Sequence, residues 1–168
     1  MESTNNKVRV LFVCLGNICR SPAAEEVFRT FVNQQGLEHF IEADSAGTYS
    51  GHRGQLPDKR MRVHASTRDY TLTHLARTVR ESDFEDFDII VAMDGANRQD
   101  LMDLAPTVEA QRKIVMMVSY CRHPHGYDYV PDPYYEGSEG FEKVLDILED
   151  ACGGLLNYIQ KRFLPDNT

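Results

Sequence analysis

The sequence predicts an α/β fold, a single-domain doubly wound sheet of four parallel strands with helices on both faces. Four short apolar runs, rich in β-branched residues, fit strands that are buried on both faces. Helical segments separate these runs, and strands that alternate with helices imply a parallel sheet with right-handed crossovers. The length of 168 residues suits one domain with a sizeable core.

Each expected element has its own signal in the sequence. The predicted strands are the apolar runs at residues 7–14, 40–46, 87–93 and 114–118. The predicted helices span residues 21–35, 57–65, 94–104 and 140–163. Gly36 ends the first helix, and the Gly153-Gly154 pair is expected to weaken or bend the last one. Residues 1–6 are expected to be disordered, and residues 7–165 are expected to form the domain.

Three further segments are predicted to lack long helices or strands. Residues 49–55 form a glycine-rich loop, and residues 72–81 are irregular or briefly helical. Residues 122–136 contain two histidines, four tyrosines and three prolines. Such a composition is typical of a long functional loop.

A tight loop joins the first predicted strand to the first predicted helix and reads Cys14-Leu15-Gly16-Asn17-Ile18-Cys19-Arg20. Ser21-Pro22 marks the helix start, with Ser21 as the N-cap and Pro22 at the first helical position. A helix N-terminus carries partial positive charge and unpaired N–H groups, and inward-turned loop amides form a nest for an anion. Gly16 and Asn17 tolerate the unusual dihedral angles that such a loop demands.

Two side chains give this loop its predicted chemistry. Arg20 presents a planar guanidinium that matches phosphate oxygens. Cys14 stands at the strand end, where the loop amides, the helix dipole and Arg20 all favour its thiolate. A thiolate at the base of an anion cradle suits in-line attack on the phosphorus of a bound phosphate ester. The alternative interpretation is a buried structural cysteine beside an ordinary turn.

The same stretch resembles the signature of the low-molecular-weight protein tyrosine phosphatase family. The resemblance rests on Cys14-x5-Arg20-Ser21, preceded by VLFV and followed by PAAE. It extends over nearly the whole chain, because DSAGT at 44–48 and HLAR at 74–77 resemble other family segments. The resemblance implies the strand order 2-1-3-4. It also implies that phosphate is bound by Leu15, Gly16, Asn17, Ile18, Cys19, Arg20 and Ser21.

A second motif supplies a general acid. Expelling a tyrosine oxygen as an anion is slow, because its conjugate acid has a pKa of about 10. A positioned carboxylic acid speeds such a step by roughly 10²–10⁴. Asp132 stands between two prolines late in the chain and resembles the general acid of the family, although Asp-Pro-Tyr alone is also a simple turn. The predicted catalytic residues are Cys14, Arg20 and Asp132, acting through a phosphocysteine without a metal.

The resemblance also implies a set of residues that support the loop. These loop-supporting residues are Ser45, His74 and Glu25. Ser45 and His74 would form with Asn17 a hydrogen-bond network that fixes the strained loop, and Glu25 would be a partner for His74. Ser21 would hydrogen-bond the Cys14 thiolate. Without the resemblance, a lone histidine is more often a surface or packing residue.

The four cysteines lie at positions 14, 19, 121 and 152. The family resemblance implies that Cys19 resolves an oxidised Cys14 as a reversible disulfide, which shields the nucleophile from over-oxidation. The alternative for Cys19 is a small buried side chain. Cys121 and Cys152 are expected to be buried and inert.

The predicted substrate is phosphotyrosine, and this prediction rests on the residues expected to line the pocket. Tyr134 and Tyr135 could wall the ring by stacking, and Ile18 suits a phenyl group. A related group of protein-arginine phosphatases carries threonine at the position of Ile18, which would better meet a guanidinium. Family members commonly place an aromatic residue at the position of Gly51, and Tyr49 is the nearby candidate to replace it.

Two further functions remain open for this fold. A thiol-dependent arsenate reductase needs extra cysteines to relay a disulfide, and residues 72–93 contain none. A non-catalytic phosphate-binding module would need neither a thiolate nor an acid. The presence of Cys14, Arg20 and Asp132 together argues against such a module.

Composition limits the partners and cofactors. A net charge of −8 argues against nucleic acid or an anionic membrane as the main partner. No apolar run approaches the ~18–20 residues of a membrane span, and the N-terminus lacks the apolar core of a signal peptide. The cysteines show no zinc spacing, and His123-Pro124-His125 is interpreted as a solvated loop, so no metal or cofactor is expected.

The expected partners follow from the predicted reaction. They are phosphotyrosine-containing proteins, a tyrosine kinase among them, and phosphate-like oxyanions are expected to inhibit. A monomer is the default expectation. Few cysteines without a disulfide framework favour a reducing cytoplasm.

Overall fold

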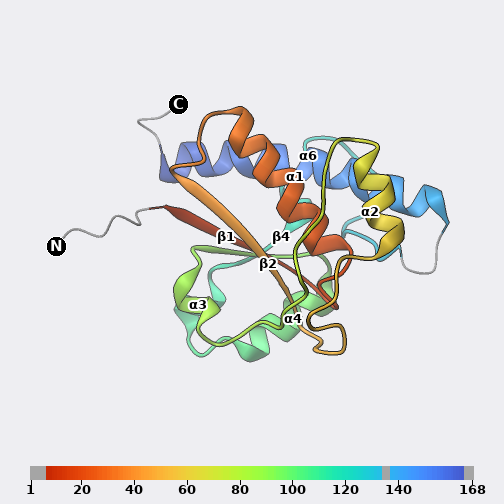
Figure 1. Cartoon of the computed structure of the whole chain (residues 1–168). Coiled ribbons are helices and arrows are strands. Elements are labelled where there is room, and N and C mark those ends of the chain that lie inside the picture. The colour runs from red at the N-terminus through yellow and green to blue at the C-terminus, as the bar shows by residue number, and fades with distance from the viewer. Residues whose placement is uncertain (1–6, 134–136, 165–168) are drawn as a thin grey trace.

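The computed structural model describes residues 7–133 and 137–164 (Figure 1). The four strands are β1 (Val8–Cys14), β2 (Ile41–Gly47), β3 (Ile89–Ala92) and β4 (Ile114–Met116). They form one sheet in the order β2-β1-β3-β4, and every neighbouring pair is parallel. The predicted α/β class and the strand order 2-1-3-4 are therefore confirmed. Residues 1–6, for which disorder was expected, lie outside the described residues.

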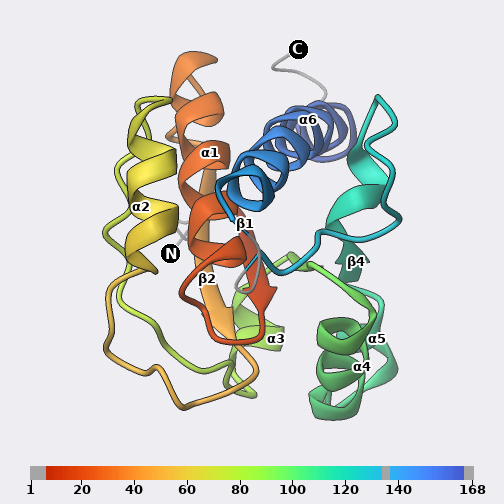
Figure 2. The same cartoon turned by 90° about the vertical axis from the view of Figure 1, so that its right-hand side faces the viewer.

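Helices cover both faces of the sheet, as predicted (Figures 1 and 2). One face carries α1 (Arg20–Gln34), α2 (Lys59–Ser66) and α6 (Ser138–Phe163). The other face carries α3 (Asp83–Asp86), α4 (Gly95–Leu104) and α5 (Val108–Gln111). The sequence did not predict the four-residue helices α3 and α5.

Strand β1 is buried on both sides because it lies between β2 and β3. Its side chains alternate between the two cores, as the period of two requires. Val10, Phe12 and Cys14 belong to the core under α1 and α6, and Leu11 and Val13 belong to the core of the opposite face. Burying side chains of this size contributes roughly 1.5–3 kcal/mol each, so the strand that ends at Cys14 is firmly anchored.

Helix α1 begins one residue earlier than predicted. Its first residue is Arg20 and its N-cap is Cys19, whose side chain makes no capping hydrogen bond. Ser21 is therefore not the N-cap, and its hydroxyl instead lies 3.0 Å from Cys14 Sγ. Pro22 falls in the first turn, where its missing N–H costs nothing because those N–H groups have no intrahelical acceptor.

Helix α6 runs unbroken through Gly153 and Gly154, which were expected to weaken or bend it. A close contact at Gly154 gives another reason for a glycine there. A Cβ atom at Gly154 would lie 1.9 Å from the carbonyl oxygen of Tyr120. Tyr120 ends the 3₁₀ helix η1 (Met117–Tyr120), which follows β4 directly and shortens the predicted fourth strand. The glycine thus lets η1 approach the helix closely.

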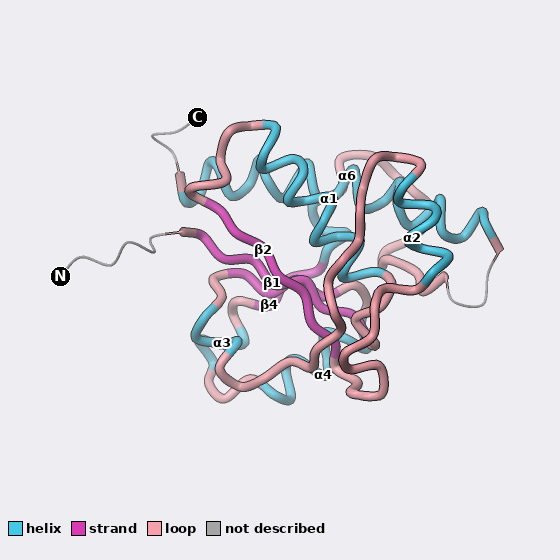
Figure 3. The backbone as a smooth tube through the Cα atoms, viewed as in Figure 1, coloured by secondary structure: helices cyan, strands magenta, loops and turns pink. Residues whose placement is uncertain are grey.

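The loops that follow the strands gather beyond the carboxyl ends of the sheet (Figure 3). Ligands bind at this edge in open parallel sheets, where the strand order reverses. The irregular segment predicted at residues 72–81 runs along this edge and forms a bridge from Thr78 to Gly47. Among the described residues, no helix combines the length and apolarity that crossing a membrane requires.

Candidate active site

The loop after β1 turns its carbonyl groups away from its centre. The carbonyl oxygens of Cys14, Leu15 and Ile18 accept hydrogen bonds from the N–H groups of Thr48, Tyr49 and Asp58, respectively. Within the described part of the chain, the N–H groups of residues 15–19 have no protein acceptor. Buried N–H groups require a partner, so this ring of amides is prepared to bind an anion.

Asn17 holds the shape of this loop. Its φ angle of 57° is left-handed, which asparagine tolerates better than most residues. Its side chain is fully buried and donates to Ser21 Oγ at 2.9 Å and to Ser45 Oγ at 3.0 Å. The side-chain oxygen of Asn17, Oδ1, lies 3.0 Å from His74 Nε2 and accepts from the backbone N–H of Arg77 at 2.9 Å. The structure therefore brings the predicted support residues together around Asn17.

Glu25 completes this network from helix α1. Its carboxylate accepts a hydrogen bond of 2.6 Å from Ser45 Oγ and lies 3.4 Å from His74 Nδ1. Asp44 approaches the same ring nitrogen at 3.5 Å, so the histidine faces two carboxylates. Because Ser45 donates its hydrogen to Glu25, it accepts from Asn17, and the direction of the hydrogen bonds from Asn17 through Ser45 to Glu25 is set.

This direction reaches the thiol of Cys14. Ser21 accepts from the Asn17 amide, so its own hydrogen is left for Cys14 Sγ at 3.0 Å or for the Ala46 carbonyl at 3.4 Å. A hydroxyl that donates to sulfur stabilises the thiolate over the thiol. Cys14 is 3% exposed and lies at the base of the amide ring.

Arg20 is clamped from the side opposite the loop. One nitrogen donates to Asp94 Oδ2 at 2.7 Å and to the Val130 carbonyl at 2.9 Å, and its side chain is only 4% exposed. Burial alone would lower the pKa of Arg20, but the charges of Cys14, Asp94 and Asp132 raise it. The guanidinium therefore stays charged and fixed in orientation.

A cavity of about 300 Å³ opens above Cys14. Its lining residues are Cys14, Leu15, Gly16, Ile18, Cys19, Arg20, Tyr49, His52 and Asp132. Asp132 stands at the rim, with Oδ2 3.8 Å from Arg20 Nη2 and a side chain that is 47% exposed. The predicted nucleophile, guanidinium and acid thus share one cavity. The predicted wall residues Tyr134 and Tyr135 lie outside the described residues.

Tyr49 occupies the space that a side chain at Gly51 would fill. A Cβ atom at Gly51 would lie 2.2 Å from the Tyr49 ring. The ring meets His52 edge-on at 5.9 Å between centroids, and both residues line the cavity. The ring of Tyr49 therefore lies where a side chain at Gly51 would be, beside the cavity.

Several residues of this site had no role in the sequence analysis. Asp94 caps α4 by accepting from the N–H of Asn97, and it also accepts a hydrogen bond from Arg20. The contact with Arg20 could not be predicted, because an aspartate before a helix indicates only a cap. Arg77 forms ion pairs with Asp44 and Asp83 beneath the support network. His52 was missed because a histidine in a glycine-rich loop carries no distinctive signal.

All four cysteines are free thiols in the structure. Cys19 is buried beside Cys14, and burial, followed by the charges of Cys14, Asp58 and Asp132, raises the pKa of the Cys19 thiol well above its usual range. Cys152 is fully buried, as expected. Cys121 is only partly buried, which corrects the expectation of a buried residue, and burial with the nearby Asp150 raises its pKa to about 11.

Two groups of metal-ligating side chains occur within the described residues. The first is formed by Glu25, Asp44 and His74, in which His74 already contacts both carboxylates and Asn17 within the support network. The second, formed by Cys121, His125 and Asp150, lies outside this cavity.

Asn17 allows a direct test of the support network. We expect Asn17→Gly to keep the left-handed backbone but to leave Ser21, Ser45 and His74 without their shared partner. The loss should lower the free energy of unfolding by about 1–3 kcal/mol and should lower kcat more than it raises KM. Thermal melting and steady-state kinetics would measure both. Asn17→Ala adds backbone strain, so an alanine variant that outperforms the glycine variant would contradict this account.

This arrangement defines a class of protein. A cysteine at the base of an amide ring, a fixed guanidinium and a rim carboxylate supply a nucleophile, charge stabilisation and a proton donor. Located at the carboxyl edge of a parallel sheet, they make up a cysteine-dependent phosphatase site.

Comparisons with known proteins identify the family. The sequence matches the family model described as low molecular weight phosphotyrosine protein phosphatase over residues 9–164. A low molecular weight protein-tyrosine-phosphatase of Streptomyces coelicolor is 44% identical, with 92% of this chain and 94% of that protein covered. The human low molecular weight phosphotyrosine protein phosphatase is 38% identical, with 88% and 92% covered. A crystal structure of a protein tyrosine phosphatase from Entamoeba histolytica has a TM-score of 0.89 and 45% identity, with 92% and 98% covered. The chain belongs to the low molecular weight phosphotyrosine protein phosphatase family.

Proposed function

We propose that this protein hydrolyses phosphotyrosine in proteins, with Cys14 as nucleophile and Asp132 as general acid and then base. The observation that carries the proposal is that Cys14, Arg20 and Asp132 line one cavity, together with loop residues whose N–H groups have no acceptor among the described residues. Family membership supports the same activity.

In the first step the phosphate dianion binds to the amides of residues 15–20 and to the guanidinium of Arg20. The thiolate of Cys14 attacks phosphorus in line, and the bond from phosphorus to the tyrosine oxygen breaks. Protonated Asp132 gives its proton to that oxygen, so tyrosine leaves as a neutral phenol. A phosphocysteine remains on Cys14.

In the second step the same groups reverse their roles. The carboxylate of Asp132 takes a proton from water, and the oxygen of that water attacks phosphorus. The sulfur–phosphorus bond breaks, and Cys14 leaves as a thiolate that the hydroxyl of Ser21 stabilises at 3.0 Å. Inorganic phosphate then departs. Arg20 and the amides neutralise the charge on the phosphoryl oxygens throughout both steps.

The proposed specificity for phosphotyrosine rests on the cavity wall. Ile18 and the rings of Tyr49 and His52 line the space above Cys14. An apolar side chain and two ring faces suit a flat phenyl ring better than a guanidinium, which needs hydrogen-bond acceptors. Initial rates on a phosphotyrosine peptide and a phosphoarginine peptide, both measured in EDTA, test this. We expect clear preference for phosphotyrosine, and preference for phosphoarginine would overturn the assigned substrate.

The second test asks whether the ring of Tyr49 takes the place of an aromatic side chain at position 51. We expect Tyr49→Ala to raise KM for a phosphotyrosine peptide by roughly two- to tenfold, since an aromatic contact of this kind is worth roughly 0.5–1.5 kcal/mol. Adding Gly51→Trp to that variant should restore much of the loss, because the ring would return to the space vacated by Tyr49. Steady-state kinetics on the single and double variants would show it. A double variant no better than the single one would mean that the Tyr49 ring does not replace an aromatic residue at position 51.

We also propose a reversible redox protection. Peroxide oxidises the Cys14 thiolate to a sulfenic acid, and Cys19 then displaces the hydroxyl to form a disulfide, which a thiol reductant reopens. Support comes from the burial of both cysteines in one loop, where Cys19 cannot readily reach an external partner.

The raised pKa of Cys19 gives this protection a pH dependence. Cys19 stays protonated at neutral pH, and only its thiolate attacks the sulfenic acid. The rate of disulfide formation should therefore rise with pH between about 7 and 9. Stopped assays followed by mass spectrometry would measure the disulfide directly. As a control, Cys19→Ser should lose activity to peroxide irreversibly, and full recovery of this variant with thiol would contradict a resolving role.

The remaining proposals concern the substrates, inhibitors, cellular location and oligomeric state of the enzyme. We propose phosphotyrosine-containing proteins, a tyrosine kinase among them, as substrates, and inhibition by phosphate-like oxyanions that occupy the amide ring. The free cysteines support a reducing cytoplasm. A monomer remains the proposed state, to be measured by analytical ultracentrifugation.

A further inference from the structure

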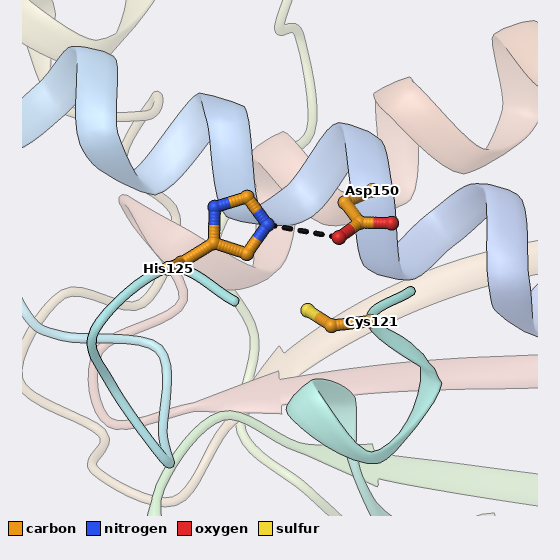
Figure 4. Close-up of side chains that lie close together, drawn as sticks. All are labelled: Cys121, His125 and Asp150. Carbon is orange, nitrogen blue, oxygen red and sulfur yellow. Dashed lines mark hydrogen bonds and ion pairs between the residues drawn. The ribbon is translucent and has the colours of Figure 1, made fainter. Parts of the chain in front are cut away.

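A second cluster of reactive side chains lies outside the active-site cavity. Cys121 follows η1, His125 belongs to the loop that leads toward Asp132, and Asp150 lies on α6. Figure 4 shows the sulfur, the imidazole and the carboxylate pointing toward one another from these three segments. The cavity beside them shares no lining residue with the active-site cavity.

We propose that Cys121, His125 and Asp150 form a Zn²⁺ site, with water as the fourth ligand. Sulfur, imidazole nitrogen and carboxylate oxygen are the three donor types that zinc binds in proteins. Nothing in the proposed phosphatase chemistry uses these residues. The sequence alone favoured a solvated loop, because the aspartate that completes the set lies 25 residues after His125.

The distances between the donor atoms suit such a site. Each residue offers one ligand atom, and these atoms all lie within 4.8 Å of one another. Tetrahedral zinc with ordinary bond lengths holds its ligands about 3.3–3.7 Å apart. His125 Nε2 and Asp150 Oδ2 are already hydrogen-bonded at 2.8 Å. Movements on the order of 1 Å therefore convert the cluster into a coordination shell.

Asp150 is held in place by groups other than the proposed ligands. It is buried, and its carboxylate accepts from the N–H groups of Arg122 at 3.0 Å and His123 at 2.9 Å. Such outer contacts orient a ligand and keep it charged. The half-exposed guanidinium of Arg122 pairs with Oδ1 at 3.4 Å. Oδ2, which accepts the N–H of His123, faces Nε2 of His125 at 2.8 Å and has a further lone pair for the metal.

The cavity provides access and a place for the water ligand. It has a volume of about 320 Å³ and is lined by residues of the η1 turn, the loop and α6. Zinc binding expels the thiol proton of Cys121 to solvent, while Nε2 of the neutral His125 ring coordinates the metal and the single ring proton resides on Nδ1. A bound ion would join three segments and stabilise the fold by an amount that grows with the logarithm of the free Zn²⁺ concentration above its Kd.

The test uses the full chain with Cys14→Ser and Cys19→Ser, which removes the active-site thiols as competing ligands. The affinity and stoichiometry of Zn²⁺ binding are measured by competition with a chromophoric chelator. Absorption spectra are recorded on protein loaded with Co²⁺ in place of Zn²⁺. We expect one equivalent of Zn²⁺, a raised melting temperature and a thiolate-to-cobalt charge-transfer band. Adding Cys121→Ser should abolish the band. That substitution or His125→Ala should weaken Zn²⁺ binding by more than about a hundredfold, since even outer contacts are worth 10- to 100-fold.

His123→Ala is the matched control, because His123 lines the same cavity without being a proposed ligand. It should retain the charge-transfer band and bind Zn²⁺ almost unchanged. Absence of Zn²⁺ binding in the parent variant, binding that survives Cys121→Ser, or an equal loss in His123→Ala would each overturn the proposal. Circular dichroism of every variant separates loss of the site from loss of the fold.

Discussion

Replacing Cys14 with serine is expected to abolish turnover of phosphotyrosine substrates while leaving the amide ring intact. Serine is close in size and keeps a group beside Ser21, but at neutral pH it offers no anionic nucleophile. Loss of a nucleophile that acts in concert with its neighbours costs on the order of 10⁵ or more in kcat. Initial rates and binding of inorganic phosphate by calorimetry, both on purified protein, would measure the two effects separately.

The matched control for this prediction is Cys121→Ser, which changes a thiol that does not line the active-site cavity. It should keep full turnover. Retained activity in Cys14→Ser would show that another group attacks phosphorus. Loss of phosphate binding together with turnover would show instead that the loop had collapsed, and the nucleophile would then have to be tested by alkylation of the wild-type thiol.

The second large effect is expected at Asp132, and its size should depend on the leaving group. Asp132→Ala should slow hydrolysis of a tyrosine ester by roughly 10²–10⁴, because the phenol then leaves as an anion with a conjugate-acid pKa of about 10. Esters of more acidic phenols need little protonation, so their first step should stay fast. With those esters the slow second step should produce a burst of phenol followed by slow turnover.

Rapid-mixing measurements on a series of aryl phosphates would reveal this pattern. Asp128→Ala is the control, because it removes a carboxylate from the same loop at a position that does not line the cavity. An equal loss for every leaving group would exclude Asp132 as the general acid and would leave it a role in binding or loop structure.

Much of the fold follows from local patterns. The apolar runs predicted the four strands, since only strands buried on both faces read as continuous β-branched segments. The start of α1 was misplaced by one residue because Ser21 is a favourable N-cap in sequence terms, yet its hydroxyl is needed by Cys14. Tertiary chemistry overrides local capping preference here. Gly154 likewise reflects contact with Tyr120, which no local pattern displays.

Some residues of the active site could be predicted from the sequence, and others could not. Cys14 and Arg20 are the two ends of one seven-residue stretch and could be predicted together. The family resemblance added Asp132 and the residues around Asn17. Asp94 could not be predicted, because its contact with Arg20 joins residues 74 positions apart. The cluster at Asp150 was missed for the same reason, since its partners meet only when α6 packs against η1.

The most direct test of the proposed mechanism is to trap its intermediate. Wild-type protein is mixed with a phosphotyrosine peptide, quenched within the first turnover and digested for mass spectrometry. The mechanism predicts phosphate on Cys14, and none in Cys14→Ser. Phosphate on any other side chain, or single-turnover hydrolysis that passes through no phosphoprotein, would contradict it.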